Sequence, residues 1–156
     1  MNDSKVMALS KRLPIAGVRQ YAGEPVLVDG KQPRAAILPV PYDGTSTWGK
    51  GADQGPVALF EALENMELFD IETGSEVHGE GIAVLENLAL EHEGSAKSPE
   101  EMCQGVRKKV GAILDQGVLP VLVGGEHSVS IGAIQACAAA EPGLSVLQLD
   151  AHSDLR

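Results

Sequence analysis

Two short apolar runs, separated by a helix-like stretch, constrain the fold of this chain more than any other feature. Residues 118–123 and 144–149 are rich in Val and Leu, which is typical of buried strands, and residues 130–140 between them favour a helix. The order strand, helix, strand implies a right-handed crossover and predicts a mostly parallel α/β sheet. The continuous apolar character of residues 118–123 further predicts a strand that is covered on both faces.

The upstream sequence extends this alternation of strands and helices. Residues 35–40 form another apolar run bounded by turn formers, and a loop rich in Gly, Ser and Thr then reaches Gly55. Pro56 is expected in the first turn of a helix that continues to residue 63. Residues 68–71 and 81–85 could each form a short strand.

A further helix carries a clear start signal. Ser98 is expected to cap it, a proline and two acids follow in its first turn, and it is predicted to run to about Asp115 before Gly117 ends it. Apolar residues at helical spacing form a stripe along one face of this helix. This predicted stripe comprises Met102, Val106, Val110 and Ile113.

Length, charge and cysteine content narrow the class of protein. With 156 residues, the chain is long enough for one domain with a real core, expected over residues 35–156 after an N-terminal extension of residues 1–34. The net charge of −10 argues against nucleic acid or anionic membranes as partners. Two cysteines do not make a disulfide framework, and no apolar run has the length of a signal peptide or membrane span. The sequence therefore predicts a cytoplasmic protein with reduced thiols.

A polar cluster directly follows each of the two downstream apolar runs. The first is Gly-Gly-Glu-His-Ser at 124–128, and the second is Asp-Ala-His-Ser-Asp at 150–154. Because ligands bind beyond the carboxyl ends of parallel strands, the two clusters are expected to converge if their strands are neighbours. Side chains alternate along an extended chain, so the two aspartates and the histidine of the second cluster should point the same way.

The donor atoms of these clusters predict a metal site. Asp150 and Asp154 would repel each other on one face unless a cation lay between them. With His127 and His152 they form an oxygen-rich set that has imidazole and no thiolate, which disfavours structural zinc and favours Mn²⁺ or a similar ion. Asp150 could bridge two ions, and a two-metal site lowers the pKa of a bridging water, which can then attack a substrate.

Less specific interpretations of the same residues stay open. A histidine after a strand is often a structural residue, and a D-x-H pattern is common by chance. Gly124 and Gly125 could instead cradle a phosphate at the start of a helix. The sequence has no G-x-G-x-x-G pattern, however, and Glu126 would repel phosphate. The pairing of both clusters, each after a predicted strand, favours the metal interpretation.

Both clusters resemble the first two metal-binding signatures of the ureohydrolases, the family of arginase and agmatinase. Residues 41–56, Pro-Tyr-Asp-Gly-Thr-Ser-Thr-Trp-Gly-Lys-Gly-Ala-Asp-Gln-Gly-Pro, also look like the long active-site loop of agmatinase-type members. Glu126 favours agmatinase as well, because arginases more often have aspartate there. The similarity covers roughly residues 35–156. It implies a truncated three-layer α/β/α fold of the arginase/deacetylase type, with a mostly parallel sheet.

The resemblance also implies roles for individual residues. His127 and Asp154 would bind one Mn²⁺, His152 would bind the other, and Asp150 would bridge the two ions. Asp154 would also help pass a proton from the bridging hydroxide to the leaving amine. The implied reaction is hydrolysis of a small cationic guanidino substrate, with agmatine giving putrescine and urea in polyamine biosynthesis. The full-length enzyme is implied to be a homo-oligomer.

In one respect the chain departs from the family. Members continue to a second aspartate pair, a histidine-bearing loop and a glutamate that contacts substrate, none of which has a counterpart in this sequence. Two Mn²⁺ bring +4, whereas Asp150, Asp154 and one hydroxide return only −3. We therefore expect an incomplete fragment that binds metal weakly, has little or no activity, and exposes apolar surface along residues 144–149.

Other functions share parts of this pattern. Guanidinobutyrase, guanidinopropionase, arginase and formiminoglutamase would use the same chemistry on other substrates. A zinc deacetylase on a related fold also places D-x-H at a strand end, although Asp154 and the first cluster fit a binuclear manganese enzyme better. A non-catalytic metal-binding fragment is the third alternative.

Five further polar or aromatic residues carry weaker expectations. His78 and His92 lie in glutamate-rich stretches and are expected to be solvated rather than to bind metal. Glu126 could orient a metal ligand through a hydrogen bond. Trp48 and Asp53 lie in the loop after the first strand, where they could face substrate or serve only the structure of the loop.

Overall fold

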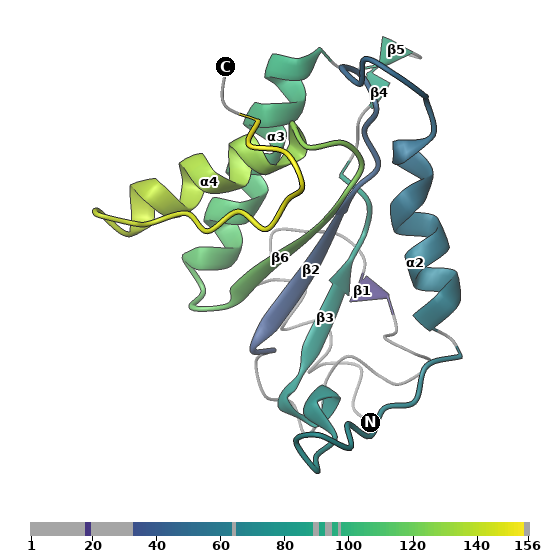
Figure 1. The fold of residues 1–156 in the computed structure, drawn as a ribbon. Helices are drawn as coiled ribbons and strands as arrows, with labels where there is room; N and C mark the ends of the chain where they lie inside the picture. Colours follow the sequence, from purple (N-terminus) through teal and green to yellow (C-terminus); the bar gives the residue numbers. More distant parts are fainter. Residues whose placement is uncertain are drawn as a thin grey trace.

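The computed structural model describes residues 18–19, 33–63, 65–88, 91–92, 95–96 and 98–154. Within this part of the chain, four strands form one sheet in the order β1-β3-β2-β6 (Figure 1). The strands are β1 (Val18–Arg19), β2 (Ala35–Val40), β3 (Ile82–Leu85) and β6 (Leu119–Gly124). β2 pairs in parallel with β3 and with β6, whereas β1 pairs antiparallel with β3. The mostly parallel sheet predicted from the sequence is therefore confirmed.

Three α-helices accompany the sheet in the described residues. They are α2 (Gly55–Leu63), α3 (Pro99–Leu114) and α4 (Val129–Ala140). α3 and α4 pack against each other, and α2 lies on the other side of the sheet (Figure 1). This arrangement follows from the connections, because the β2–α2–β3 and β3–α3–β6 crossovers run in opposite directions across the sheet. Right-handed crossovers then place their helices on opposite faces, which gives the three expected layers.

Short elements connect the larger ones. They are the 3-10 helices η1 (Ala52–Gln54) and η2 (Val77–Glu80) and the antiparallel ribbon of β4 (Glu91–His92) and β5 (Ser95–Ala96). Residues 81–85 contain β3, as predicted, but residues 68–71 form no strand beyond an isolated bridge between Asp70 and Ser75. The Asp70 carboxylate accepts a hydrogen bond from the Glu72 amide at 2.8 Å, which favours a turn over a strand.

The start of α3 follows its sequence signal. The Ser98 hydroxyl accepts a hydrogen bond from the Glu101 amide at 3.2 Å, and the Ser98 amide donates to the Glu101 carboxylate at 2.9 Å. A cap of this kind satisfies amides that a helix start leaves without partners, and it contributes about 1 kcal/mol. The helix ends at Leu114, and Gly117 follows with a left-handed φ of 70°, close to the predicted end.

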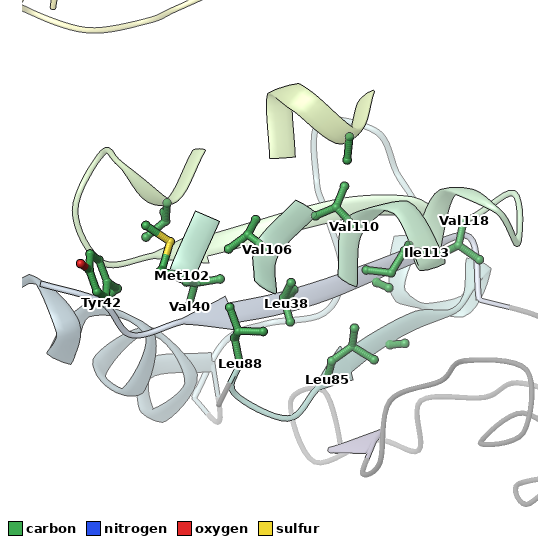
Figure 2. Packing of buried hydrophobic residues seen from close by; sticks show 14 residues of the cluster. Leu38, Val40, Tyr42, Leu85, Leu88, Met102, Val106, Val110, Ile113 and Val118 are labelled. Carbon is green, nitrogen blue, oxygen red and sulfur yellow. The ribbon is translucent and has the colours of Figure 1, made fainter. Parts of the chain in front are cut away.

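The predicted stripe of α3 lies at the centre of the hydrophobic core. Met102, Val106, Val110 and Ile113 are each at most 1% exposed. They pack on Leu38 of β2 and on its neighbours in β3 (Figure 2). Because burying a side chain of this size contributes roughly 1.5–3 kcal/mol, the contact between α3 and the sheet holds the strand ends firmly in place.

β6 is covered less completely than the sequence predicts. Leu119 is 63% exposed and Val121 is 37% exposed, so one face of this strand is open in the described structure. β6 is also an edge strand of the sheet that the described residues form. The expectation of a strand covered on both faces is therefore wrong here. Apolar composition shows that both faces of a strand can be buried, but it does not show which neighbouring elements cover them.

The strand predicted at residues 144–149 is not formed, and this prediction is wrong for the described structure. The segment pairs with no strand of the described residues and runs back along α4 (Figure 1, yellow). Leu147 is 83% exposed and Leu149 is 88% exposed. An apolar sequence becomes a strand only where a neighbouring strand exchanges hydrogen bonds with it. The crossover predicted across residues 118–149 is consequently absent from the described part of the chain.

The predicted N-terminal extension is described only in part. Val18–Arg19 belong to β1, and its pairing with β3 joins this part of the extension to the sheet. Residues 1–17 and 20–32 lie outside the described residues, and so do the side chains of His78 and His92. The expectations for these segments and histidines are therefore not tested by the fold.

The two cysteines lie on the paired helices α3 and α4. Cys103 and Cys137 are half-buried and form no disulfide, which agrees with the expectation of free thiols. Among the described residues, no helix combines the length and the apolar composition that crossing a membrane requires.

Candidate metal centre

The carboxyl ends of β2 and β6 lie side by side, and this junction positions the first polar cluster. Val40 pairs with Gly124 at the last position of the register. Beyond it, the Glu126 amide donates a hydrogen bond to the Tyr42 carbonyl at 3.0 Å. Gly125 permits this approach, since a β-carbon there would lie 2.8 Å from the Tyr42 nitrogen and 2.9 Å from the Val40 oxygen. The Gly-Gly-Glu-His-Ser cluster therefore begins at a tightly fixed strand end.

Three of the four predicted ligands converge beyond this junction. One nitrogen of His127 and one carboxylate oxygen each of Asp150 and Asp154 lie within 4.8 Å of one another. His127 Nδ1 is 2.7 Å from Asp154 Oδ2, and His127 Nε2 is 3.5 Å from Asp150 Oδ2. The Asp150 side chain is only 17% exposed although the residue as a whole is open to solvent, because its backbone carries most of the exposure. The two sequence clusters thus meet even though residues 144–149 form no strand.

His152 does not join this group, contrary to the expected alternation. Its amide donates a hydrogen bond to Asp150 Oδ1 at 2.8 Å, and its Nδ1 lies 3.6 Å from the same oxygen, outside the three-residue cluster. The chain bends at residues 151–152, and Asp154 has a left-handed φ of 50°. Side chains alternate only along an extended strand, whereas this segment forms a turn that the Asp150 carboxylate stabilises.

Opposite charges shift the pKa values within the cluster. The hydrogen bond with Asp154, together with the negative charge of Asp150, raises the pKa of the His127 imidazole above its ordinary value. The hydrogen bond from the His152 amide, and then the positive charge of His127, lower the pKa of Asp150. Without another cation, the proton on His127 therefore offsets the neighbouring negative charge.

We expect His127 to titrate above pH 6.5 in the metal-free protein, and Asp154→Asn to lower its pKa. Its ion pairs stabilise the fold fully below the unfolded-state pKa near 6.5, and this stabilisation is lost as the pH rises through the raised folded-state pKa. The pH dependence of the imidazole proton resonances in NMR spectra measures the shift. Asp115→Asn, at the end of α3, is the control, and an equal His127 pKa in both variants would contradict the described contacts.

The hydrogen bonds of Glu126 lead to the loop of residues 41–55 rather than to the His127 ring. Its carboxylate accepts hydrogen bonds from the Thr45 amide at 3.1 Å, from the Thr45 hydroxyl, and from the Ser128 hydroxyl at 2.6 Å. The expected hydrogen bond from Glu126 to a metal ligand is therefore not among these contacts. Glu126 joins the loop that follows β2 to the cluster that follows β6.

Asp43 organises this loop from within, and sequence reasoning missed it. Its carboxylate accepts hydrogen bonds from the Ser46 hydroxyl, the Gly51 amide at 2.6 Å and the Ala52 amide at 3.2 Å, and Lys50 Nζ lies 3.4 Å away. The bonds from Ser46 and Gly51 lower the pKa of Asp43 to about 2. The available signal was an aspartate followed closely by Gly, Ser and Thr, a composition typical of loops that bond side chain to backbone.

An open pocket of about 590 Å³ includes the three cluster residues. Its apolar walls come from β6, from the start of α4 and from residues 146–147. Trp48 and Asp53, which could have faced substrate, are not among its lining residues. Trp48 is 99% exposed, and Asp53 lies in η1.

Comparisons with known proteins account for most of the chain. The model of the Arginase family matches residues 33–156. The chain belongs to the arginase family. N(1)-aminopropylagmatine ureohydrolase from Synechocystis sp. is 30% identical over 144 residues, which cover 90% of this chain and 47% of that protein. The arginase-family chain thus spans about half the length of this curated relative.

Solved structures show the same fold. Agmatine ureohydrolase of Thermoplasma volcanium superposes with a TM-score of 0.59 at 28% identity, over 67% of this chain and 34% of that one. Formiminoglutamase of Trypanosoma cruzi, crystallised with Mn²⁺, gives a TM-score of 0.61 at 23% identity, over 71% and 38% of the two chains. The arginase-type fold and the ureohydrolase resemblance of the sequence are therefore confirmed.

Proposed function

We propose that this chain is part of an agmatinase-like ureohydrolase, an enzyme that hydrolyses a guanidino compound to urea and an amine. The convergence of His127, Asp150 and Asp154, from the two sequence clusters of an arginase-family chain, carries the proposal. A guanidinium group is resonance-stabilised and a poor electrophile, so its hydrolysis needs a water molecule that the site activates.

The donor atoms of the cluster fit divalent ions such as Mn²⁺. Two carboxylates and an imidazole lie together at a solvent-open site, and no cysteine of the described residues joins them, which favours Mn²⁺ over structural zinc. We assign His127 and Asp154 to one ion and Asp150 to both. His152, beside Asp150 but outside the cluster, is assigned to the second ion. When bound, two such ions supply the positive charge that lowers the pKa of a water molecule.

The side chains themselves hold protons and attract the substrate. Asp154 Oδ2, 2.7 Å from His127 Nδ1, is placed to accept a proton from the attacking water and to return it to the leaving amine. General acid–base transfer of this kind contributes roughly 10²–10⁴-fold to a rate. The net charge of −10 favours the approach of a cationic substrate.

We propose agmatine as the first substrate to test. The Thermoplasma volcanium structure is named for agmatine, and the Synechocystis relative is named for N(1)-aminopropylagmatine, which extends agmatine by an aminopropyl group. The two compounds share the guanidino end and differ at the amine end, so urea release from each distinguishes them. With agmatine the product is putrescine, which places the proposed enzyme in polyamine biosynthesis. A cytoplasmic location and a full-length homo-oligomer complete the proposal.

We further propose that these 156 residues bind metal weakly by themselves. The chain spans 47% of the Synechocystis relative. Asp150, Asp154 and one hydroxide leave the +4 of two Mn²⁺ incompletely neutralised, and water would fill many coordination positions. Side chains that this sequence does not supply would then have to complete the centre.

Metal binding and urea release test the proposal together. Asp150→Asn removes the carboxylate charge assigned to both ions, and we expect it to weaken Mn²⁺ binding at least about tenfold. The electron paramagnetic resonance signal of free Mn²⁺ measures binding to the chain, and Mn²⁺-dependent urea release is measured on a version with the length of the relatives. Glu61→Gln, on the exposed surface of α2, is the control. One zinc ion per chain in place of manganese would favour a deacetylase instead, and equal Mn²⁺ binding by Asp150→Asn would contradict the centre.

A further inference from the structure

The Glu126 carboxylate is the point where two segments of the proposed active site meet. It accepts hydrogen bonds from the amide and the hydroxyl of Thr45 and from the hydroxyl of Ser128. Thr45 lies 81 positions away in the sequence, so this contact joins the loop after β2 to the cluster after β6. A carboxylate that accepts hydrogen bonds from three donor groups in two loops is well suited to fix their relative position.

The backbone on both sides of His127 is held by related contacts. The Glu126 amide donates to the Tyr42 carbonyl at 3.0 Å, and the Ser130 hydroxyl donates to the His127 carbonyl at 2.7 Å. Glu126 and Ser128, which flank His127 in the chain, are bonded to each other at 2.6 Å. Because a metal ligand keeps its geometry only when its surroundings fix it, these bonds favour a preset position for the imidazole.

The loop that Glu126 holds is itself tied together internally. The Asp43 carboxylate bonds to the Gly51 amide at 2.6 Å, and Lys50 Nζ donates to the Asp43 carbonyl at 2.7 Å and to the Ser46 hydroxyl at 3.0 Å. A displacement at one point of such a loop is therefore transmitted through it. Trp48, the single tryptophan of the chain, lies within this loop and is 99% exposed.

We propose that Glu126 is a positioning residue that couples the metal ligand His127 to the loop of residues 41–55. The inference rests on the proposed function, because it takes His127 as a ligand. With the bonds to Thr45 in place, the loop restrains the backbone that carries the imidazole. Such coupling is reciprocal, so a restraint that strengthens metal binding also makes bound metal restrict the loop.

Manganese titrations of the 156-residue chain test this coupling with two readouts. The electron paramagnetic resonance signal of free Mn²⁺ gives the affinity, and the fluorescence anisotropy of Trp48 reports the motion of the loop. In the wild type, Mn²⁺ should raise the anisotropy. Glu126→Gln should weaken Mn²⁺ binding about 10- to 100-fold, the range found when a residue supporting a ligand is changed, and should remove the anisotropy response.

Substitutions at Thr45 provide a second, milder test. Thr45→Val keeps the shape of the side chain but removes the hydroxyl donor, so both readouts should change in the same direction as in Glu126→Gln, by a smaller amount. Thr45→Ser restores the donor and should behave as the wild type. Glu61→Gln on α2 is the matched control for the loss of a carboxylate. A role limited to fold stability would lower the melting temperature and leave the Mn²⁺ affinity of the folded protein unchanged.

The outcomes separate this inference from the proposed function. If the wild type binds Mn²⁺ and neither Glu126→Gln nor Thr45→Val alters the affinity, the coupling is overturned and the metal centre stands. An altered affinity without any response of Trp48 overturns the coupling to the loop. If neither this chain nor a version with the length of the relatives binds Mn²⁺, the metal centre is overturned, and the coupling with it. If only the longer version binds Mn²⁺, the same variants are compared in that version, and an unchanged affinity there overturns the coupling.

Discussion

Gly132→Ala is expected to destabilise the chain by about 1–3 kcal/mol, although alanine is the better helix former. Gly132 lies on α4 where this helix packs on α3. A β-carbon there would lie 2.9 Å from Val106 Cβ and 3.0 Å from the Arg107 nitrogen, and nearer still to the Cys103 carbonyl oxygen. Two of these three atoms belong to the α3 backbone, which cannot yield unless the helices separate. The resulting strain outweighs the gain of about 1 kcal/mol in helix propensity.

The same substitution within α3 is the matched control and should have the opposite sign. Gly111 has open space at the position of a β-carbon, so Gly111→Ala should stabilise the chain by about 0.5–1 kcal/mol. Urea denaturation followed by far-ultraviolet circular dichroism measures both free energies of unfolding. Effects of equal sign and size would contradict the close approach of α3 and α4. Since α4 begins two residues after His127, a separated helix pair would also shift the candidate metal centre.

The three α-helices and the strands β2, β3 and β6 were predictable because their signals act between residues close in sequence. The apolar run at residues 35–40 became β2 with unchanged bounds. The capping serine at Ser98 and the left-handed Gly117 delimit α3 close to where they were expected. A cap, a turn or an apolar stripe depends on residues that are close in sequence and not on distant segments. These elements therefore follow from local chemistry.

Residues 144–149 show where local signals fail. Their apolar sequence permits a strand, but the neighbouring strand that would bind them cannot be read from the segment itself. The meeting of His127 with Asp150 and Asp154 was predicted from two adjacent strands, whereas the structure achieves it through a segment that runs back along α4. The convergence is therefore present for a different structural reason, and the same absence of a strand leaves His152 outside the group.

The loop network was not predictable for a related reason. The sequence predicts that Glu126 supports a ligand, but its partner Thr45 lies far away in the sequence. A contact of this kind leaves no repeating pattern in the sequence from which it could be predicted. A single aspartate in a loop has many possible partners, so the sequence alone does not single out Asp43. Only the fold selects the amides of residues 51–52 as those partners. Side-chain hydrogen bonds between loops depend on the placement of both loops, which local propensities do not encode.

Gly125→Ala is expected to have the largest effect of any single methyl addition near the candidate site. Its β-carbon would lie 2.8 Å from the Tyr42 nitrogen and 2.9 Å from the Val40 oxygen, and nearer still to the Tyr42 oxygen. All three are backbone atoms at the end of β2, so the strand ends must move apart, at about 3 kcal/mol. That movement also breaks the hydrogen bond from the Glu126 amide to the Tyr42 carbonyl, which adds about 1 kcal/mol.

Gly49→Ala is the control that shows whether the effect of Gly125→Ala comes from this contact or from the loss of a glycine in general. Gly49 lies in the adjoining loop, where a β-carbon would meet nothing within 4 Å, so its substitution should change the free energy of unfolding by no more than about 0.5 kcal/mol. Urea denaturation compares the two variants, and Mn²⁺ titration of whatever fraction remains folded shows whether His127 keeps its place. If Gly125→Ala were as stable as Gly49→Ala, the ends of β2 and β6 would not touch as described. The loop of residues 41–55 would then have no fixed position beside the imidazole, and the coupling through Glu126 would lose its structural basis.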